Sequence, residues 1–174
     1  SSQMNPHFIF NSLNSIQRYI LENDKRSSNK YLARFSRLMR LVLDNSRERF
    51  IPLSSELEAL DLYMELEALR FKDKMSYSIN VDEELNSSDI LIPTLLLQPF
   101  VENAIWHGIM HKGEKGHLAI EVKAVADGII CAIEDDGVGR EYAKAIKKEN
   151  KVAHKSAGMS ITEKRIEVAN KLYR

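Results

Sequence analysis

The sequence predicts an α+β protein, in which a helical hairpin precedes an α/β sandwich. Up to about residue 71 the apolar residues recur at three- and four-residue spacing, the period of an amphipathic helix. Beyond residue 76 apolar and polar residues alternate in short runs, the period of a strand. The change of period predicts a helical domain over residues 1–73 and a domain of helices and one mixed or antiparallel sheet over residues 74–174.

Two helices are predicted in the first 45 residues. The first runs from about residue 5 to 22, with an apolar stripe formed by Ile9, Leu13, Ile16 and Ile20. A displaced polar stripe includes His7, which we expect to face solvent or a visiting domain. The second helix has apolar positions at Leu32, Phe35, Leu38, Met39 and Val42. Two such helices joined by a short polar loop predict an antiparallel hairpin.

Later helices are predicted from capping signals. Ser55 and Glu58 have the spacing of a capping box and predict a third helix after Pro52. A fourth helix is predicted within IPTLLLQPFVENAIWHGI, with Pro93 near its start and Gly108 near its end. A last helix is predicted from Gly158 to about Leu172.

Alternating residues predict strands around residues 77–81, 118–122 and 129–133. The lysine-rich segments KGEKG and KKENK are predicted as loops or solvated helix ends. Cys131, the single cysteine, lies in the last alternating run, so we expect it to be buried and inert. No disulfide framework is possible within one chain, which fits a reducing cytoplasm.

The composition excludes several classes of function. The chain carries 25 Lys and Arg against 25 Asp and Glu, so its formal net charge gives no reason to expect direct nucleic-acid binding. No apolar run approaches the ~20 residues that span a bilayer, so we expect any membrane anchor to lie upstream of this sequence. The absence of GxxxxGK[ST], paired CxxC and HExxH patterns disfavours P-loop ATPases and zinc enzymes.

Two segments carry polar residues in patterns that suit a ligand. In IEDDGVGR, Asp135, Gly137 and Gly139 are spaced D-x-G-x-G, which by itself is also typical of a plain turn. On the preceding helix Asn103 and His107 are four residues apart and share one face. The apolar neighbours of Asn103 suggest that a ligand or an internal network satisfies its amide.

These segments, taken with others, resemble a known family. LQPFVENAIWHGI resembles the N-box, and EDDGVGR the first glycine box, of the GHKL (Bergerat) ATP-binding fold. The segment QMNPHFIFNSLNSI resembles the phosphoacceptor segment of LytS/YehU-type sensor histidine kinases, and PLSSELEALDLYMELEALRF resembles their third helix. The resemblance covers nearly the whole chain, and its three ordered motifs are more specific together than any one alone.

The resemblance implies that the protein binds ATP with Mg²⁺. Asn103 would be the Mg²⁺ ligand, because this ion prefers hard oxygen atoms. Asp135 would accept a hydrogen bond from the adenine amino group, since an ionised carboxylate is an acceptor only. Gly137 and Gly139 would allow the backbone to approach the nucleotide, and Gly158 would bring a helix N-terminus near the phosphates.

The resemblance also implies a protein-histidine kinase that phosphorylates His7 and passes the phosphoryl group to an aspartate on a response regulator. Imidazole suits this role because it is partly neutral at physiological pH and can form a covalent phosphoryl intermediate. Phe8 stands where many other histidine kinases have an acidic residue, so Glu102 is our candidate base. His107 and Lys112 are candidate phosphate contacts.

The chain departs from the family at its end. KSAGMSITEKRI has Ser156 and Met159 where the second glycine box prefers Gly and Leu, so we expect weaker ATP binding or a looser lid. We also expect the last strand of the ATP-binding domain to be missing, because the sequence stops at Arg174.

The hairpin predicts a homodimer, because two amphipathic helices bury little surface alone and form a four-helix bundle when doubled. From the resemblance we expect a cytoplasmic domain of an inner-membrane sensor, whose response regulator can carry a LytTR-type DNA-binding output. Two alternatives stay open. One is a GHKL ATPase without phosphohistidine, in which ATP turnover survives loss of His7; the other is a catalytically silent dimeric signalling module.

Overall fold

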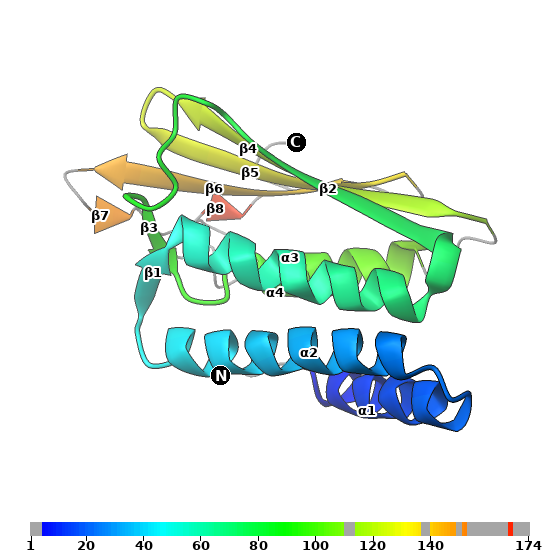
Figure 1. Ribbon diagram of the computed structural model, residues 1–174. Helices are drawn as coiled ribbons and strands as arrows, with labels where there is room; N and C mark the ends of the chain where they lie inside the picture. Colours follow the sequence, from blue (N-terminus) through cyan, green and yellow to red (C-terminus); the bar gives the residue numbers. More distant parts are fainter. Residues whose placement is uncertain (1–4, 110–113, 137–139, 149–150, 153–166, 169–174) are drawn as a thin grey trace.

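The helices and strands form three layers in the computed structural model, which describes residues 5–109, 114–136, 140–148, 151–152 and 167–168. In Figure 1 the sheet is the top layer, α3 and α4 lie beneath it, and the α1–α2 hairpin forms the bottom layer. The helices are α1 (Pro6–Leu21), α2 (Lys25–Asn45), α3 (Leu53–Arg70) and α4 (Gln98–Asn103). The predicted mixture of helices and sheet is confirmed.

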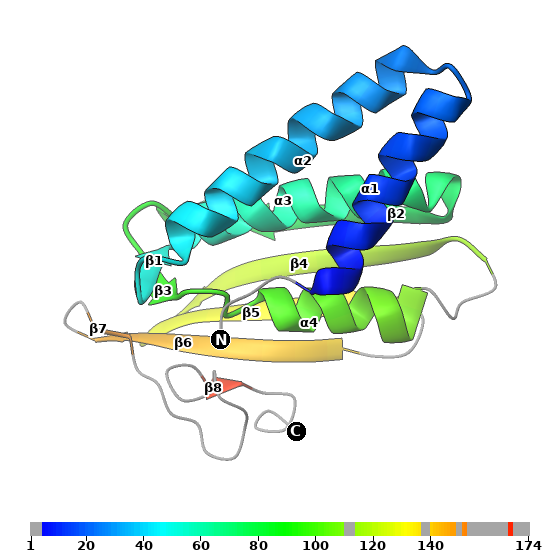
Figure 2. The same cartoon turned by 90° about the horizontal axis from the view of Figure 1, so that it is seen from below.

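The α1–α2 hairpin begins and turns at capped positions. Asn5 caps α1 by accepting a hydrogen bond from the backbone N–H of His7 at 2.8 Å. Asn23 has a φ of 60°, and the side chain of Asp24 then caps α2 by accepting from the N–H of Ser27 at 3.0 Å. Figure 2 shows the two helices meeting at this turn and diverging from it.

Helix α3 is buried at ten of its 18 positions because it lies between the hairpin and the sheet. The predicted capping box is wrong, since the helix begins at Leu53 and no side chain caps it. Its first N–H groups are satisfied by another segment: Leu53 donates to the carbonyl of Ile90 at 2.7 Å, and Ser54 to that of Ser87 at 3.0 Å.

The region before α4 also differs from the prediction. Pro93 ends a short strand, β3 (Leu91–Pro93), which pairs antiparallel with β1 (Phe50–Pro52). The fourth helix therefore begins only at Gln98, after Leu95 has turned the chain with a φ of 55°. It continues directly into a π-helical turn, η2 (Ala104–Ile109), so Gly108 lies within this turn and not beyond its end.

The main sheet has the order β2-β4-β5-β6-β7, with β8 also paired to β6. Strands β2 and β4 are parallel, and the other pairs are antiparallel. Its strands are β2 (Met75–Val81), β4 (Gly116–Val125), β5 (Gly128–Asp135), β6 (Arg140–Lys148), β7 (Lys151–Val152) and β8 (Glu167–Val168). The three predicted strands are confirmed.

Two predictions near the end of the chain are wrong where residues are described. Lys147 and Lys148 pair with β7 as part of β6, so KKENK is in part a strand edge and not a loop or helix end. Glu167 and Val168 form β8, because their backbone pairs with β6, whereas a helix was predicted there. The rest of that predicted helix lies outside the described residues.

One hydrophobic core connects the helices to the sheet. It contains Phe8 of α1, Leu38 of α2, Leu60 of α3, Ile105 of η2 and Ile120 of β4. The predicted boundary between residues 73 and 74 falls in a short 3₁₀ turn, η1 (Lys72–Lys74), directly before β2. Since the core crosses that boundary, the division into two domains remains a prediction. Among the described residues, no helix has the length and apolar character of a membrane span.

Candidate functional site

His7 lies at the start of α1, where its side chain is exposed and contacts Trp106 of η2. The two ring centroids are 6.1 Å apart with an interplanar angle of 64°, an edge-to-face arrangement. Phe8 points the other way, is 1% exposed, and packs on Tyr63 with ring centroids 4.8 Å apart. Phe8 therefore anchors the start of α1 on α3, which explains an apolar residue directly after His7.

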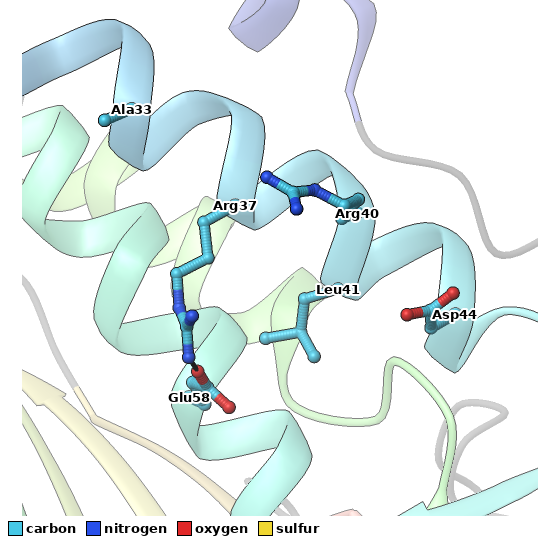
Figure 3. A pocket seen from close by; sticks show the side chains of 6 residues that line it. All are labelled: Ala33, Arg37, Arg40, Leu41, Asp44 and Glu58. Carbon is cyan, nitrogen blue, oxygen red and sulfur yellow. Dashed lines mark hydrogen bonds and ion pairs between the residues drawn. The ribbon is translucent and has the colours of Figure 1, made fainter. Parts of the chain in front are cut away.

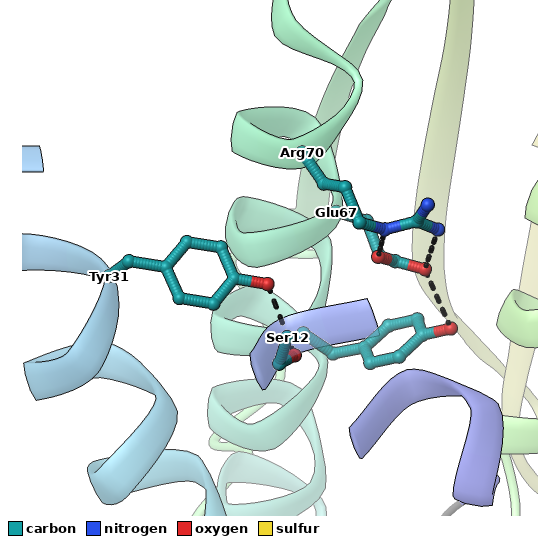
Figure 4. Close-up of polar contacts among 5 residues, drawn as sticks. Ser12, Tyr31, Glu67 and Arg70 are labelled. Atoms are coloured by element: carbon teal, nitrogen blue, oxygen red, sulfur yellow. Dashed lines mark hydrogen bonds and ion pairs between the residues drawn. The ribbon is translucent and has the colours of Figure 1, made fainter. Parts of the chain in front are cut away.

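A buried ion pair on α3 lies behind this contact. Arg70 donates from Nε to Glu67 Oε1 at 2.9 Å and from Nη2 to Oε2 at 3.2 Å (Figure 4). Glu67 is 0% exposed and also accepts from the hydroxyl of Tyr63 at 3.4 Å. The Arg70 guanidinium lies 5.8 Å from the ring centroid of Trp106. This ion pair was not predicted, although opposite charges three residues apart on a helix are a sequence signal for one.

Glu102, the candidate base, lies on α4 and is partly buried. Burial raises the pKa of its carboxyl group, the hydrogen bond from Gln98 lowers it, and the nearby charge of Glu67 raises it further. The bond from Gln98 Nε2 to Glu102 Oε2 is 3.0 Å long. The pKa of Glu102 thus depends on the charge of Glu67, whose partner Arg70 lies beside Trp106.

Asn103 and His107 follow on α4 and η2, and both side chains are exposed. The Asn103 amide therefore needs neither a ligand nor an internal network to satisfy it, contrary to the prediction, because water reaches the exposed side chain. Exposure nevertheless leaves the amide oxygen free to bind a ligand. Glu102 and Asn103 are neighbours in sequence, yet one faces the protein and the other faces solvent.

The end of β5 packs directly on η2. A Cβ atom added at Gly108 would lie 2.9 Å from both Cγ and Oδ2 of Asp135. Any larger residue at position 108 would force the Asp135 carboxylate away. The structure thus brings together the helical segment of Asn103 and His107 and the strand end of Asp135. The other predicted site residues, Lys112, Gly137, Gly139 and Gly158, lie outside the described residues.

A second buried carboxylate ties α3 to the start of α4. Glu56 is 1% exposed, and its Oε2 accepts a hydrogen bond from the backbone N–H of Leu97 at 2.9 Å. Burial raises the pKa of Glu56 to about 7, against the opposing effect of the N–H groups of Leu97, Gln98 and Leu95. Its Oε1 has no partner within the described part of the chain. Glu56 was not among the residues predicted from the sequence.

Cys131 is buried, and burial raises the pKa of its thiol to about 12, with a smaller contribution from the charge of Glu56. The predicted burial of Cys131 is confirmed, and the raised pKa is in keeping with the low reactivity expected of it. Across the described ranges, no three His, Cys, Asp or Glu residues gather in a way that could hold a metal ion.

A surface hollow between α2 and α3 lies apart from these residues. Figure 3 shows Arg37 of α2 reaching Glu58 of α3 in an ion pair, with Arg40 and Asp44 further along α2. None of the predicted site residues lines it. The candidate site is therefore the region around the start of α1, α4, η2 and the end of β5.

Comparison with known proteins identifies relatives of this chain. Residues 1–75 match the family model described as Histidine kinase. The chain is 39% identical over 140 residues to the sensor protein LytS of Oceanobacillus iheyensis, covering 80% of this chain and 23% of LytS. It is 36% identical over 138 residues to the sensor histidine kinase YpdA of Escherichia coli, covering 79% of this chain and 24% of YpdA. The predicted resemblance to LytS-type sensor histidine kinases is confirmed.

The matched region is a limited part of these relatives, since the chain spans about a quarter of the length of LytS and YpdA. A solved structure of the histidine kinase ThkA in complex with the response regulator protein TrrA aligns with a TM-score of 0.38 and 20% identity. That alignment covers 83% of this chain and 46% of the other, and the likeness is too weak to bear on the fold.

Proposed function

Since residues 1–75 match the histidine kinase family model, we propose that this chain is the kinase portion of a two-component sensor. In this proposal it phosphorylates His7 from ATP and passes the phosphoryl group to an aspartate on a response regulator. The observation that carries the proposal is the position of His7. Its exposed ring lies against Trp106, in the same helical segment as Asn103.

The proposed nucleotide site, of the GHKL type, lies between η2 and the end of β5. The residues fit this role: Asn103 offers an exposed amide oxygen, and the Asp135 carboxylate is held against Gly108. Bound Mg²⁺ would neutralise charge on the phosphates of ATP. Asn103 would bind the ion, Asp135 would accept from the adenine amino group, and His107 would contact phosphate. Lys112, Gly137, Gly139 and Gly158 keep the roles expected of them as proposals.

In the transfer step a ring nitrogen of His7 forms a bond to phosphorus while the bond from phosphorus to the ADP oxygen breaks. The imidazole then loses the proton on its other nitrogen. Glu102 is the proposed acceptor, because burial raises the pKa of its carboxyl group and makes the carboxylate a stronger base. Phe8 stands directly after His7 and cannot accept a proton, so we look for the base on another element.

The proposed homodimer forms through the hairpin. Apolar side chains of α1 and α2 are exposed in the single chain, including Phe10 at 65%, Leu13 at 50%, Ile20 at 62% and Leu43 at 62%. Pairing two hairpins would bury this surface. We further propose that the domain lies on the cytoplasmic side of a membrane-anchored sensor, and that its response regulator can carry a LytTR-type output.

The test is incubation of the full-length protein with radiolabelled ATP and Mg²⁺, scoring phosphoprotein that is labile to acid and stable to base. The wild type should be labelled, and His7→Gln and Asn103→Ala should not. His117→Gln is the matched control, because this imidazole bonds the hydroxyl groups of β2, Ser76 Oγ at 2.8 Å and Ser78 Oγ at 3.2 Å. It should be labelled like the wild type.

The other outcomes separate the alternatives. Unlabelled wild type that still hydrolyses ATP, with hydrolysis surviving His7→Gln, would favour the ATPase. Neither labelling nor hydrolysis would favour the silent signalling module. Labelling of His7→Gln would move the phosphoacceptor to another residue.

A further inference from the structure

Trp106 is the single tryptophan of the chain, and it connects His7 to the buried cluster on α3. It lies one residue before His107 and three after Asn103, in the segment proposed to bind the nucleotide. None of the roles described above uses it. Its neighbours indicate what it does.

The indole is supported from α3. The Arg70 guanidinium lies 5.8 Å from the ring centroid of Trp106 and 4.2 Å from that of Phe71. It donates hydrogen bonds to both carboxylate oxygens of Glu67. Glu67 is fully buried, so its position is set by core packing. The Trp106 ring therefore lies near a cation whose position is set by its bonds to Glu67.

His7 is held less firmly. Its backbone is set by the Asn5 cap and by burial of Phe8, but its side chain is exposed. No hydrogen bond from its ring occurs among the described residues, and the edge-to-face contact with Trp106 is the ring contact it makes there. An exposed imidazole without this contact would sample several rotamers. Trp106 restricts that freedom and contributes little to the core.

We propose that Trp106 is a positioning residue, which seats the imidazole of His7 beside the Asn103-bearing helix of its own chain. The inference rests on the proposed function and adds two features to it. The phosphoacceptor is oriented by an aromatic contact, and phosphorylation takes place within one subunit. Loss of orientation between reacting groups commonly lowers a rate by about 10- to 100-fold, so the effect should be measurable.

The contact itself is tested without any phosphorylation. In the 174-residue chain, the ring-proton resonances of His7 are recorded by NMR in wild type, Trp106→Phe and Trp106→Ala. An aromatic ring at this distance shifts these resonances, so Trp106→Ala should move them toward random-coil positions and Trp106→Phe should move them less. Intrinsic fluorescence of the single tryptophan should likewise change in His7→Gln. Unchanged resonances in Trp106→Ala would overturn the contact.

The positioning role is tested by the kinetics of autophosphorylation in the full-length protein. Trp106→Ala should lower kcat about 10- to 100-fold and leave KM for ATP within about twofold. Trp106→Phe should retain most of the rate, because an aromatic ring is kept. A full rate in Trp106→Ala would overturn the role, as would a raised KM with unchanged kcat, which would make Trp106 a nucleotide contact. Thermal unfolding shows whether each variant folds. If Trp106→Ala does not fold, the role is judged from the kcat of Trp106→Phe, which should stay close to that of the wild type.

The own-chain reaction is tested with mixed dimers of His7→Gln and Asn103→Ala subunits. Each subunit then lacks either the phosphoacceptor or the Mg²⁺ ligand, so no label should appear. Label on the Asn103→Ala subunit would show transfer between subunits and overturn this part. An unlabelled wild-type homodimer would instead remove the proposed function, and the positioning role with it, whereas the NMR contact would stand.

Discussion

Helices α1 and α3 use their surfaces in opposite ways. On α1 the buried residues are Phe8, Ser12 and Ser15, while three of the four residues of its apolar stripe, Ile9, Leu13 and Ile20, are exposed. On α3 ten of the 18 positions are buried, including the carboxylates of Glu56 and Glu67, and only Asp61 is exposed. The hairpin thus leaves apolar surface for contacts outside the chain, whereas α3 uses its surface within the chain.

The polar contacts follow the same division. Tyr31 of α2 donates to Ser12 of α1 at 3.1 Å, a neutral hydrogen bond between the hairpin helices (Figure 4). On α3 the buried polar contacts involve charged groups, and these link α3 to α4 through Glu56 and to η2 through Arg70. Substitutions on α3 should therefore affect both stability and the candidate site, and those on the outer face of α1 should affect association.

The largest effect is expected for Glu67→Ala. This change leaves Arg70 beside a buried site without its partner, so the free energy of unfolding should fall by about 3–5 kcal/mol. Glu65→Ala is the matched control on the same helix, because Glu65 pairs with Arg34 at a partly exposed position. Its effect should stay below about 1 kcal/mol. Urea unfolding measures both, and equal losses would contradict the difference between buried and surface pairs.

A smaller effect is expected from the ionisation of Glu56. Its pKa in the folded chain, about 7, lies above the ordinary value of 4.5, so the folded state binds the proton more tightly. This tighter proton binding adds to the free energy of unfolding, and it adds most below about pH 4.5. The added stability, about 3 kcal/mol in all, is lost as the pH rises towards 7.

Glu56→Gln removes this titration and still offers an oxygen to the Leu97 N–H. Its stability relative to wild type should therefore increase between pH 5 and pH 8, as measured by urea unfolding at both values. A difference between the two proteins that does not vary with pH would show that Glu56 is ionised throughout.

The smallest effect on subunit stability is expected on the outer face of α1. Phe10→Ser changes a side chain that is 65% exposed, so the free energy of unfolding, measured on dilute protein, should change by about 0.5 kcal/mol or less. Self-association should weaken, because an apolar group is lost from the proposed dimer surface. Sedimentation velocity over a range of concentrations measures this. An unchanged association constant would place the dimer interface elsewhere.

Sequence periodicity predicted most of the elements because hydrophobic patterns report local conformation. The start of α1 and the strands β2, β4 and β5 are where the patterns place them. The capping signals at Pro93 and Ser55 and the predicted last helix at Glu167 were wrong, because pairing with a distant backbone segment decides the conformation there. Such pairing leaves little local signal, since the partner can lie anywhere along the chain.

The candidate site divides in a similar way. Motif order predicted the resemblance to sensor histidine kinases, which the comparisons confirm, whereas the roles of His7, Asn103 and Asp135 remain predictions. Local sequence did not reveal that Asn103 is exposed, that Gly108 is needed for the approach of Asp135, or that Trp106 contacts His7.

Residue types and their spacing therefore account for the chemistry available to this protein, because reactivity resides in individual side chains and short motifs. Burial and proximity were decided by the packed structure. The raised pKa of Glu56 and the ion pair of Glu67 with Arg70 exist because α3 is enclosed by two other layers. The contact between His7 and Trp106 joins residues 99 positions apart in the sequence, and only packing of α1 against α3 brings them together.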